Sequence, residues 1–176
     1  MEHAMNHFEL FSLRPSYQLD LQGLADCYRE LQQKYHPDNF AADASENQAQ
    51  VMQKAAQIND AYQTLKDPLS RAQYLLSLQD IELGGEQQTI NDIEFLMAQM
   101  ELREQLAEIE NAADPEQALE DFSKLLKQQR SDLSSSFEKA YNEQNFTFAA
   151  DQVRKLKFYA RLQQQLLQLE EKILDY

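Results

Sequence analysis

Glycine and proline are scarce in this chain, which has 3 glycines and 4 prolines among its 176 residues. Runs of β-branched residues separated by turn clusters, the usual signs of strands, are missing as well. Glutamine, leucine, alanine and glutamate are abundant instead. This composition predicts an all-α protein. Hydrophobic residues make up 43% of the chain, which is enough for a packed core, and the length predicts one or two domains.

Cysteine is nearly absent, since Cys27 has no second cysteine with which to form a disulfide. Three histidines and one cysteine do not make a metal-finger pattern, so we expect no metal site, and we expect no cofactor. The sequence shows no signal-peptide pattern and no long apolar run. These absences favour a cytoplasmic protein.

Positive charge is in deficit, with 16 basic residues against 30 acidic ones and a net charge of −14. Both halves of the chain are acidic. Such a surface repels phosphate backbones, which argues against generic nucleic-acid binding.

Capping signals predict where the first helices begin. Asp20 is a predicted N-cap for a helix over residues 21–35. Ser45 with Gln48 three residues later predicts a capping box for a helix that runs to about Lys66. Two such helices with a short connection predict an antiparallel hairpin.

Later signals predict four more helices and a division into domains. Asp67-Pro68 and Asp114-Pro115 each place a capping carboxylate before a proline, which is favoured in the first helical turn. Residues 1–80 are the predicted first domain, and residues 81–90, which contain the adjacent pair Gly84-Gly85, are the predicted linker. Residues 91–176 are predicted to form an antiparallel three-helix bundle. Its helices are expected over residues 91–112, with Asn91 and Glu94 as a capping box, and over residues 115–142 and 147–174.

His36-Pro37-Asp38 lies between the two helices of the predicted hairpin. Proline disfavours helical backbone in the residue before it, so the first helix should end at Tyr35 or His36. The tripeptide by itself also fits an ordinary surface turn. A catalytic His–Asp pair is a further alternative, but the sequence offers no nucleophile or oxyanion donor to accompany it.

The residues around this loop resemble the J-domain family of co-chaperones over about residues 5–78. The resemblance is carried by the His-Pro-Asp loop and by Asn59-Asp60-Ala61-Tyr62, Asp67-Pro68 and Arg71-Ala72-Gln73-Tyr74. It implies a regulator of the ATPase of a DnaK-type chaperone, and not an enzyme.

The same resemblance implies which residues bind the chaperone. His36, Pro37 and Asp38 are the expected contacts, with Asp38 able to accept a bidentate bond from an arginine of the partner. Arg29 and Lys34 are the expected charged contacts on the preceding helix, for which solvated surface is the alternative. This helix is neutral overall where J-domains are usually basic, and Asn39 occupies a position that is commonly lysine in the family.

The second half of the chain narrows the resemblance to the HscB family, the J-type co-chaperones of bacterial iron–sulfur cluster biogenesis. It is carried by residues 95–104, 153–158 and 169–176. The implied partners are the chaperone HscA and the iron–sulfur scaffold IscU. A J-domain adaptor for another client, and a helical structural or oligomerisation protein in which the tripeptide is incidental, are the alternatives.

A helical wheel of residues 92–112 separates two faces. The predicted core stripe contains Phe95, Ala98, Leu102, Leu106 and Ile109. The opposite side carries three large apolar residues and three carboxylates, namely Leu96, Met97, Met100, Glu101, Glu104 and Glu108.

We interpret this second side as an exposed surface that binds the scaffold, since methionine adapts to partner surfaces and flanking glutamates steer a basic partner. The alternative is that its apolar residues pack on the third helix or on the other domain. The resemblance adds Phe158 to the scaffold-binding residues. Its helix is apolar on two faces, so a position in the core is the alternative.

Overall fold

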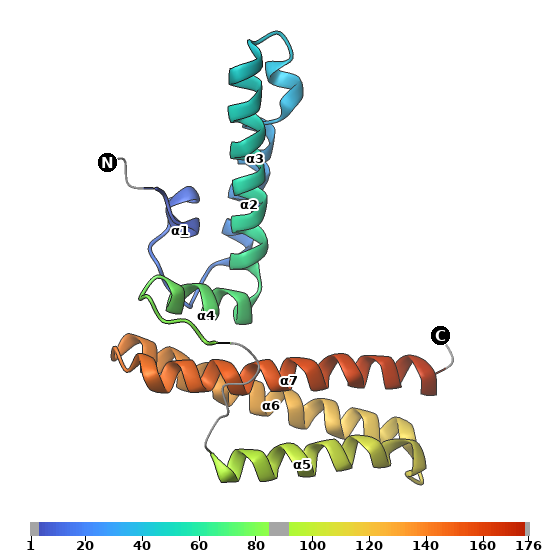
Figure 1. Cartoon of the computed structure of the whole chain (residues 1–176). Helices are drawn as coiled ribbons and strands as arrows, with labels where there is room; N and C mark the ends of the chain where they lie inside the picture. Colours follow the sequence, from blue (N-terminus) through green and yellow to red (C-terminus); the bar gives the residue numbers. More distant parts are fainter. Residues whose placement is uncertain (1–3, 85–91, 175–176) are drawn as a thin grey trace. The chain divides into compact units, whose positions relative to one another are not determined.

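The computed structural model describes residues 4–84 and 92–174, and within these ranges the chain forms seven α-helices, two short 3-10 helices and no strand (Figure 1). The predicted all-α class is therefore confirmed. The chain divides into two compact units, Met1–Gln79 and Asp80–Tyr176, which we call the N-terminal and C-terminal units. Residues 85–90 of the predicted linker lie outside the described residues. None of the described helices has the length and apolar character needed to cross a bilayer.

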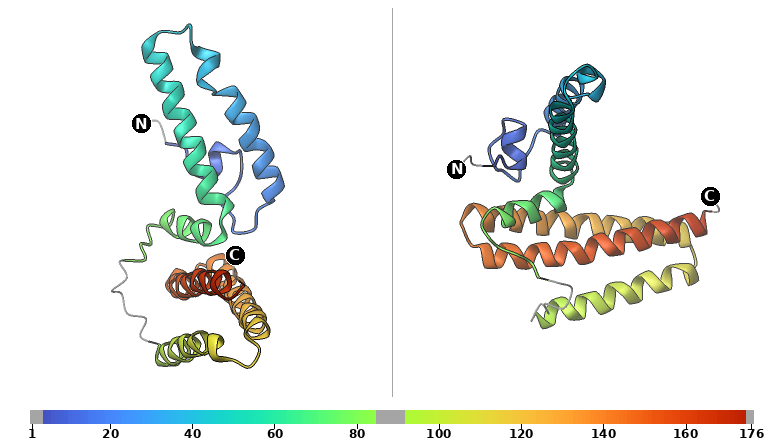
Figure 2. Two further views of the ribbon diagram at one scale, coloured as in Figure 1. Left: turned by 90° about the vertical axis from the view of Figure 1, so that its right-hand side faces the viewer. Right: turned by 45° about the horizontal axis from the view of Figure 1, so that its top comes forward.

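The N-terminal unit is built around an antiparallel pair of long helices (Figure 2). Its elements are α1 (His7–Leu10), α2 (Leu21–Lys34), the 3-10 helix η1 (Pro37–Phe40), α3 (Ser45–Lys66) and α4 (Pro68–Ser77). Each of α1, α2, η1 and α4 packs against α3, which makes α3 the centre of the unit. The predicted hairpin is thus the pair α2 and α3, and its connection contains η1.

The ends of these helices follow most of the predicted capping signals. The Asp20 carboxylate accepts the N–H of Gly23 at 3.1 Å, and the Asp67 carboxylate accepts the N–H of Ser70 at 2.9 Å. The capping box predicted at Ser45 is wrong, because Ala44 is the N-cap of α3 and no side chain caps it.

Gln48, the second member of that predicted box, has another role. Its side-chain amide donates to three carbonyl oxygens of the preceding turn, those of Phe40, Ala41 and Asp43, at 3.1–3.3 Å. The side chain therefore fastens the end of η1 to the start of α3, and it is not free to cap its own helix.

An arginine is buried in the N-terminal unit. The guanidinium of Arg71 donates to the carbonyl oxygen of Leu65 at 3.0 Å and to that of Tyr17 at 2.6 Å. It ties the end of α3 and the segment before α2 to the start of α4. The surrounding core consists of Phe8, Phe11, Tyr17, Leu24, Val51, Ile58, Ala61, Leu65, Ala72, Leu75 and Leu76.

The C-terminal unit is a bundle of three long helices, each of which runs in the opposite direction to the one before it (Figure 1). Its elements are α5 (Ile93–Glu108), the 3-10 helix η2 (Ile109–Asn111), α6 (Pro115–Asn142) and α7 (Phe146–Ile173). The main core cluster contains Phe95, Leu102, Ile109, Leu119, Phe122, Leu126, Phe158, Tyr159, Leu162 and Leu166. All three helices contribute to it, as expected for a bundle.

Side chains cap all three helices of this unit. Asp114 accepts the N–H of Gln117 at 3.1 Å, which confirms the predicted start of α6, and Asn145 accepts the N–H of Phe148 at 3.3 Å. The cap of α5 is Asp92, whereas Asn91, the predicted cap, lies outside the described residues.

Candidate functional site

The His-Pro-Asp loop is a single tight turn at the end of α2. His36 is the N-cap of η1 in extended backbone conformation, with Pro37 in the first position. The imidazole Nδ1 accepts the N–H of Asp38 at 3.2 Å, and the His36 carbonyl oxygen accepts the N–H of Asn39 at 3.0 Å. The loop is therefore held by the side chain and the backbone of its own histidine.

The carboxylate of Asp38 is left open to solvent. Its side chain is 91% exposed, and Nδ1 of His36 lies 3.6 Å from its Oδ2. Because Nδ1 already accepts the N–H of Asp38, this approach is not a hydrogen bond. Both carboxylate oxygens of Asp38 can thus accept bonds from a partner.

Asn39 fastens the loop to the preceding helix. Its side-chain amide donates to the carbonyl oxygen of Gln33 at 2.7 Å, one of the acceptors that the end of a helix leaves without an intrahelical partner. The residue that stands in place of the usual lysine therefore has a structural role in this chain.

The structure brings three of the five predicted chaperone-binding residues into one groove. Arg29, His36 and Pro37 line a hollow of about 390 Å³ between α2 and α3, together with Gln32, Gln33, Tyr35, Ala55, Ile58 and Asn59. Arg29 forms an ion pair with Asp26 one turn away.

Lys34 and Asp38 do not line this groove. The Lys34 ammonium lies 5.4 Å from the centre of the Tyr35 ring, within the range of a cation–π contact. Asp38 projects from the loop into solvent.

The two walls of the groove are joined by aromatic and polar contacts. The rings of Tyr28 and Tyr62 stack with their centres 4.0 Å apart, and the hydroxyl of Tyr28 donates to the side-chain oxygen of Asn59 at 2.6 Å. These contacts fix α2 against α3 and so fix the base on which the loop stands.

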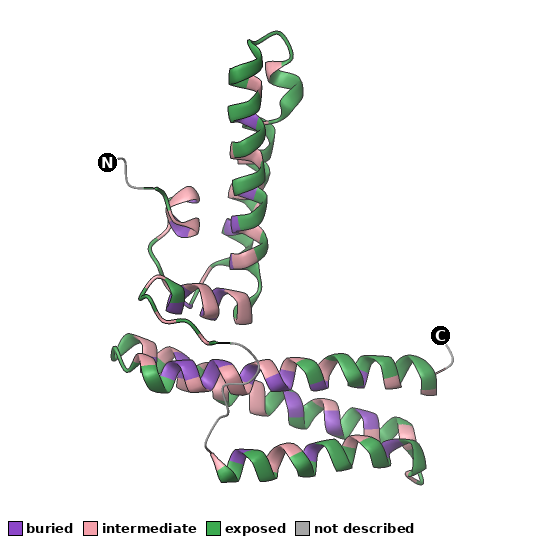
Figure 3. Cartoon of the chain, in the orientation of Figure 1, coloured by how far each residue is buried: buried purple, intermediate pink, exposed green. Residues whose placement is uncertain are grey.

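The C-terminal unit presents the apolar residues that the helical wheel places outside the core. Met97 is 66% exposed and Met100 is 71% exposed, and Leu96 is exposed as well. Phe95, Leu102 and Ile109 are buried on the opposite side of the same segment, and Figure 3 shows that buried residues occupy one side of α5. The wheel therefore separates the two faces correctly. We call Leu96, Met97, Met100, Glu101, Glu104 and Glu108 the α5 surface.

The helical wheel did not include Ile93 among the exposed apolar residues of α5, although it is also largely exposed. It precedes Met97 by four residues and Met100 by seven, a spacing that puts all three on one side of a helix. This periodicity was visible in the sequence.

Phe158 does not belong to an exposed surface. Its side chain is 2% exposed, and its ring packs edge-on against the ring of Phe95 with the centres 5.6 Å apart. The guanidinium of Arg103 lies over the same ring, 5.4 Å from its centre. Phe158 is therefore a buried residue where α7 meets α5, as in the core alternative. Its predicted part in scaffold binding stays a prediction.

The glutamates of the α5 surface line a second groove. Glu101, Glu104 and Glu108 border a hollow of about 730 Å³ between α5 and α6, with Asp121 on the other side and Ile109, Phe122 and Leu125 among its apolar lining. In the part of the chain that the structure describes, no ion pair neutralises the three glutamates. The α5 surface therefore continues into a groove that is apolar and negatively charged.

Across residues 4–84 and 92–174, no group of three or more histidine, cysteine or carboxylate side chains could hold a metal ion. The arrangement offers two candidate binding surfaces, one on each unit.

Comparison with known proteins gives the family. The model of the DnaJ domain matches residues 6–74, and that of the HSCB C-terminal oligomerisation domain matches residues 91–167. The co-chaperone protein HscB homolog of Photobacterium profundum is 50% identical over 97% of this chain and 100% of its own length. The chain belongs to the HscB family of co-chaperones.

Other HscB proteins, two of them with solved structures, are also similar to this chain. The HscB homolog of Vibrio parahaemolyticus is 52% identical over 97% of this chain and 99% of its own. The solved structure of HscB from Vibrio cholerae superposes with a TM-score of 0.87 at 45% identity, covering 96% of this chain and 99% of that one. Human HscB superposes with a TM-score of 0.88 at 26% identity, covering 97% of this chain and 84% of the human chain.

The chain is thus an HscB-type co-chaperone whose N-terminal unit contains a J-domain. A J-domain implies a DnaK-type chaperone as the partner. The loop of His36, Pro37 and Asp38 lies within the matched DnaJ domain, and the α5 surface lies within the matched C-terminal domain.

Proposed function

We propose that this HscB-type chain couples an iron–sulfur scaffold of the IscU type to a DnaK-type chaperone of the HscA type. The N-terminal unit stimulates ATP hydrolysis by the chaperone, and the C-terminal unit carries the scaffold. The protein itself catalyses no reaction. In this way it assists the maturation of iron–sulfur proteins.

The proposed action on the chaperone rests on the geometry of Asp38. Its backbone is fixed by the bond to Nδ1 of His36, while its carboxylate is 91% exposed. An arginine of the chaperone can engage both oxygens in a charge-assisted bidentate bond. Pro37 and the side-chain bond of Asn39 restrict the loop before binding, which lowers the entropic cost of docking.

The proposed binding of the scaffold rests on the α5 surface. Exposed methionines together with exposed Leu96 form an apolar area that a soluble domain does not need for its own folding. Their flexible side chains suit a partner surface, and the exposed glutamates beside them favour a partner that is basic. The choice of an iron–sulfur scaffold as the client rests on the resemblance of residues 95–104, 153–158 and 169–176 to the HscB family.

One assay tests the coupling to the chaperone. We expect the chain to raise the steady-state ATPase rate of HscA, and Asp38→Asn to reduce this stimulation to less than about a tenth, because an asparagine cannot form the bidentate ion pair. The Asn variant retains the backbone N–H that His36 accepts, so the loop keeps its shape. Equal stimulation by both proteins would exclude the J-domain mechanism.

A binding experiment tests the client. Met97→Ala with Met100→Ala should weaken binding of IscU by about tenfold or more, since each truncation removes apolar area from the contact. Leu167→Ala is the matched control, because Leu167 is an exposed apolar residue of α7 outside the α5 surface. If the wild-type chain stimulates HscA but does not bind IscU, the protein is a J-domain adaptor for another client.

A further inference from the structure

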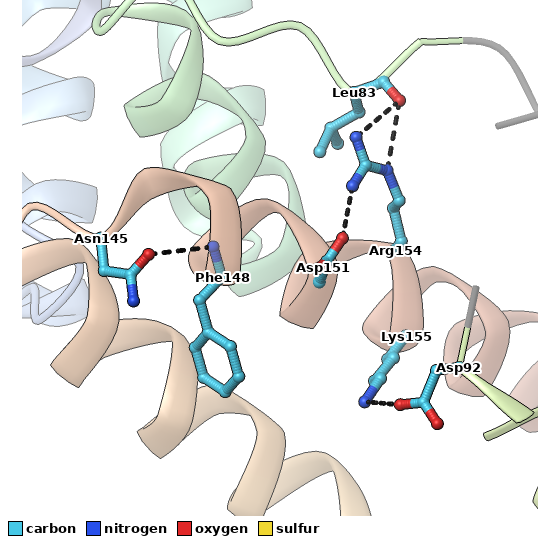
Figure 4. A network of polar contacts seen from close by, with 7 residues as sticks. All are labelled: Leu83, Asp92, Asn145, Phe148, Asp151, Arg154 and Lys155. Carbon is cyan, nitrogen blue, oxygen red and sulfur yellow. Dashed lines mark hydrogen bonds and ion pairs between the residues drawn. The ribbon is translucent and has the colours of Figure 1, made fainter. Parts of the chain in front are cut away.

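The first turn of α5 is attached to α7 through one carboxylate. Oδ1 of Asp92 accepts the N–H of Phe95 at 3.0 Å as the helix cap, and Oδ2 accepts a hydrogen bond from the Lys155 ammonium at 2.9 Å. The backbone carbonyl of Asp92 also accepts the N–H of Leu96 at 3.0 Å. Asp92 therefore defines the turn from which Leu96 and Met97 project, and Lys155 holds Asp92 (Figure 4).

Lys155 is placed for this contact by its surroundings. Its side chain is 19% exposed, and its ammonium lies 5.3 Å from the centre of the Phe95 ring, within cation–π range. The hydrogen bond from Lys155 is the main reason that the pKa of Asp92 is below its ordinary value, followed by the bond from the N–H of Phe95. Lys155 thus contacts both residues that anchor the first turn, Asp92 and Phe95.

The neighbouring residue of α7 holds the chain at a second point. The guanidinium of Arg154 is bonded to the Asp151 carboxylate at 2.6 Å and reaches the carbonyl oxygen of Leu83 at 3.4 Å (Figure 4). Consecutive residues of α7 therefore contact the chain at Leu83 and at Asp92, on either side of residues 85–91 in the sequence. The Arg154 contacts are longer, so the firmer of the two attachments is the one at the start of α5.

We propose that Lys155 is a positioning residue for client binding, which fixes the first turn of α5 through Asp92 and so sets the orientation of Leu96 and Met97. The inference rests on the proposed function, because it assumes that the α5 surface binds the scaffold. Lys155 is on another helix and is itself largely covered, so it acts through Asp92 and not by direct contact.

The apolar contacts of α5 do not make this attachment redundant. Phe95, Leu102 and Ile109 hold the buried stripe of the segment, but of these three only Phe95 lies in the first turn, where helix ends fray. The Lys155–Asp92 pair lies at that turn. A client that binds Leu96 and Met97 therefore meets an ordered turn and does not have to order it on binding.

Four variants separate this role from simple charge or stability effects. Lys155→Met keeps the apolar stem and removes the ammonium, and Asp92→Asn keeps an N-cap oxygen but removes the ion pair. Lys155→Arg keeps a cation. Lys172→Met is the matched control, since Lys172 is also an α7 lysine in an ion pair, with Glu110 of η2 at 2.6 Å near the other end of α5.

We expect Lys155→Met and Asp92→Asn each to weaken IscU binding by roughly three- to tenfold, the loss that goes with ordering a turn on binding. The double variant should lose no more affinity for IscU than either single variant, because both substitutions remove the same Lys155–Asp92 interaction. Lys155→Arg should retain most of the affinity, and Lys172→Met should bind like the wild type. Amide hydrogen exchange at Phe95 and Leu96 should be faster in Lys155→Met and unchanged in Lys172→Met.

Two results would overturn the inference. One is wild-type affinity in Lys155→Met while Met97→Ala with Met100→Ala weakens binding, which leaves the proposed function standing without the positioning role. The other is an additive loss in the double variant, which would give Lys155 and Asp92 separate roles. If the wild-type chain does not bind IscU at all, the client half of the proposed function fails, and the exchange rates alone decide whether Lys155 orders the turn.

Discussion

His7 packs against Tyr74, and its burial there favours the neutral form of the imidazole. The imidazole stacks on the ring of Tyr74 with the centres 4.3 Å apart, and its backbone N–H donates to the Tyr74 hydroxyl at 2.9 Å. Burial lowers the pKa of His7 below 6.5, and the Asp60 carboxylate, 3.5 Å from Nε2, raises it by less. The folded chain therefore binds this proton less readily than the unfolded chain.

The sign of the pH effect follows from that difference. As pH falls below about 6.5, the unfolded state takes up the proton first, so the free energy of unfolding of the N-terminal unit should fall. His7→Phe keeps a ring for stacking and should remove this part of the pH dependence. Asp60→Asn should enlarge it, because the attraction that partly restores the pKa is lost.

Hydrogen exchange of α3 amides in the full chain, followed between about pH 7.5 and 5.5, measures the opening of this unit. A wild-type chain whose protection does not change with pH relative to His7→Phe would contradict the assignment of the effect to His7.

The resemblance to J-domains points to Arg71 but does not tell where its side chain lies or what it contacts. The J-domain pattern singles out Arg71 and Tyr74, but charge alone places an arginine on the surface. In the structure Arg71 is buried, with bonds to the carbonyl oxygens of Leu65 and Tyr17. The partners come from segments 6 and 54 residues away, so no local rule could have identified them.

The turn between α6 and α7 stores a local strain. The N–H of Asn145 donates to the carbonyl oxygen of Ala140 at 2.8 Å and that of Gln144 donates to Tyr141 at 3.0 Å, the two bonds of a Schellman motif. This motif requires a left-handed residue, and Gln144 fills the position with a φ of 59°. Glycine adopts that conformation without the steric cost that a Cβ brings.

Gln144→Gly should therefore stabilise the C-terminal unit by about 1 kcal/mol, corresponding to a rise in melting temperature of roughly 4–8 °C for a unit of this size. Thermal unfolding followed by circular dichroism measures it. Gln144→Ala is the control, since alanine retains the Cβ and should give no comparable gain. A glycine variant that melts no higher than the alanine variant would show that the turn is not strained.

Three helix starts were predicted because a side chain caps the backbone of its own helix. Asp20, Asp67 and Asp114 act within three residues of themselves, so their effect is local and visible in the sequence. Gln48 was misread because its amide donates to carbonyl groups of Phe40, Ala41 and Asp43, a turn whose shape the sequence did not reveal.

The two faces of α5 were predictable for a different reason. One side of this helix contacts the bundle and the other meets solvent, so the periodicity of apolar residues has one clear interpretation for the buried stripe. Helix α7 is buried on more than one side, and periodicity could not decide whether Phe158 belongs to the core. That decision needed the positions of Phe95 and Arg103 in space.

The two proposed binding surfaces differ in charge. The net charge is −14, and the three glutamates of the α5 surface have no cationic partner among the described residues. By contrast α2, beside the His-Pro-Asp loop, carries Arg29 and Lys34 against Asp26 and Glu30 and is neutral. Electrostatic steering should therefore act mainly on the client and less on the docking of α2 to the chaperone.

Ionic strength tests this asymmetry. Raising the salt concentration from about 0.05 to about 0.5 M should slow IscU association by roughly tenfold, because mobile ions screen the exposed glutamates. Replacing Glu101, Glu104 and Glu108 by glutamine should flatten this dependence. Replacing Glu116, Glu143 and Glu171, three exposed glutamates outside the α5 surface, removes the same net charge and should leave most of the dependence in place. Stopped-flow association kinetics measures the slopes, and equal slopes for the two triple variants would mean that net charge, and not the α5 surface, steers the client.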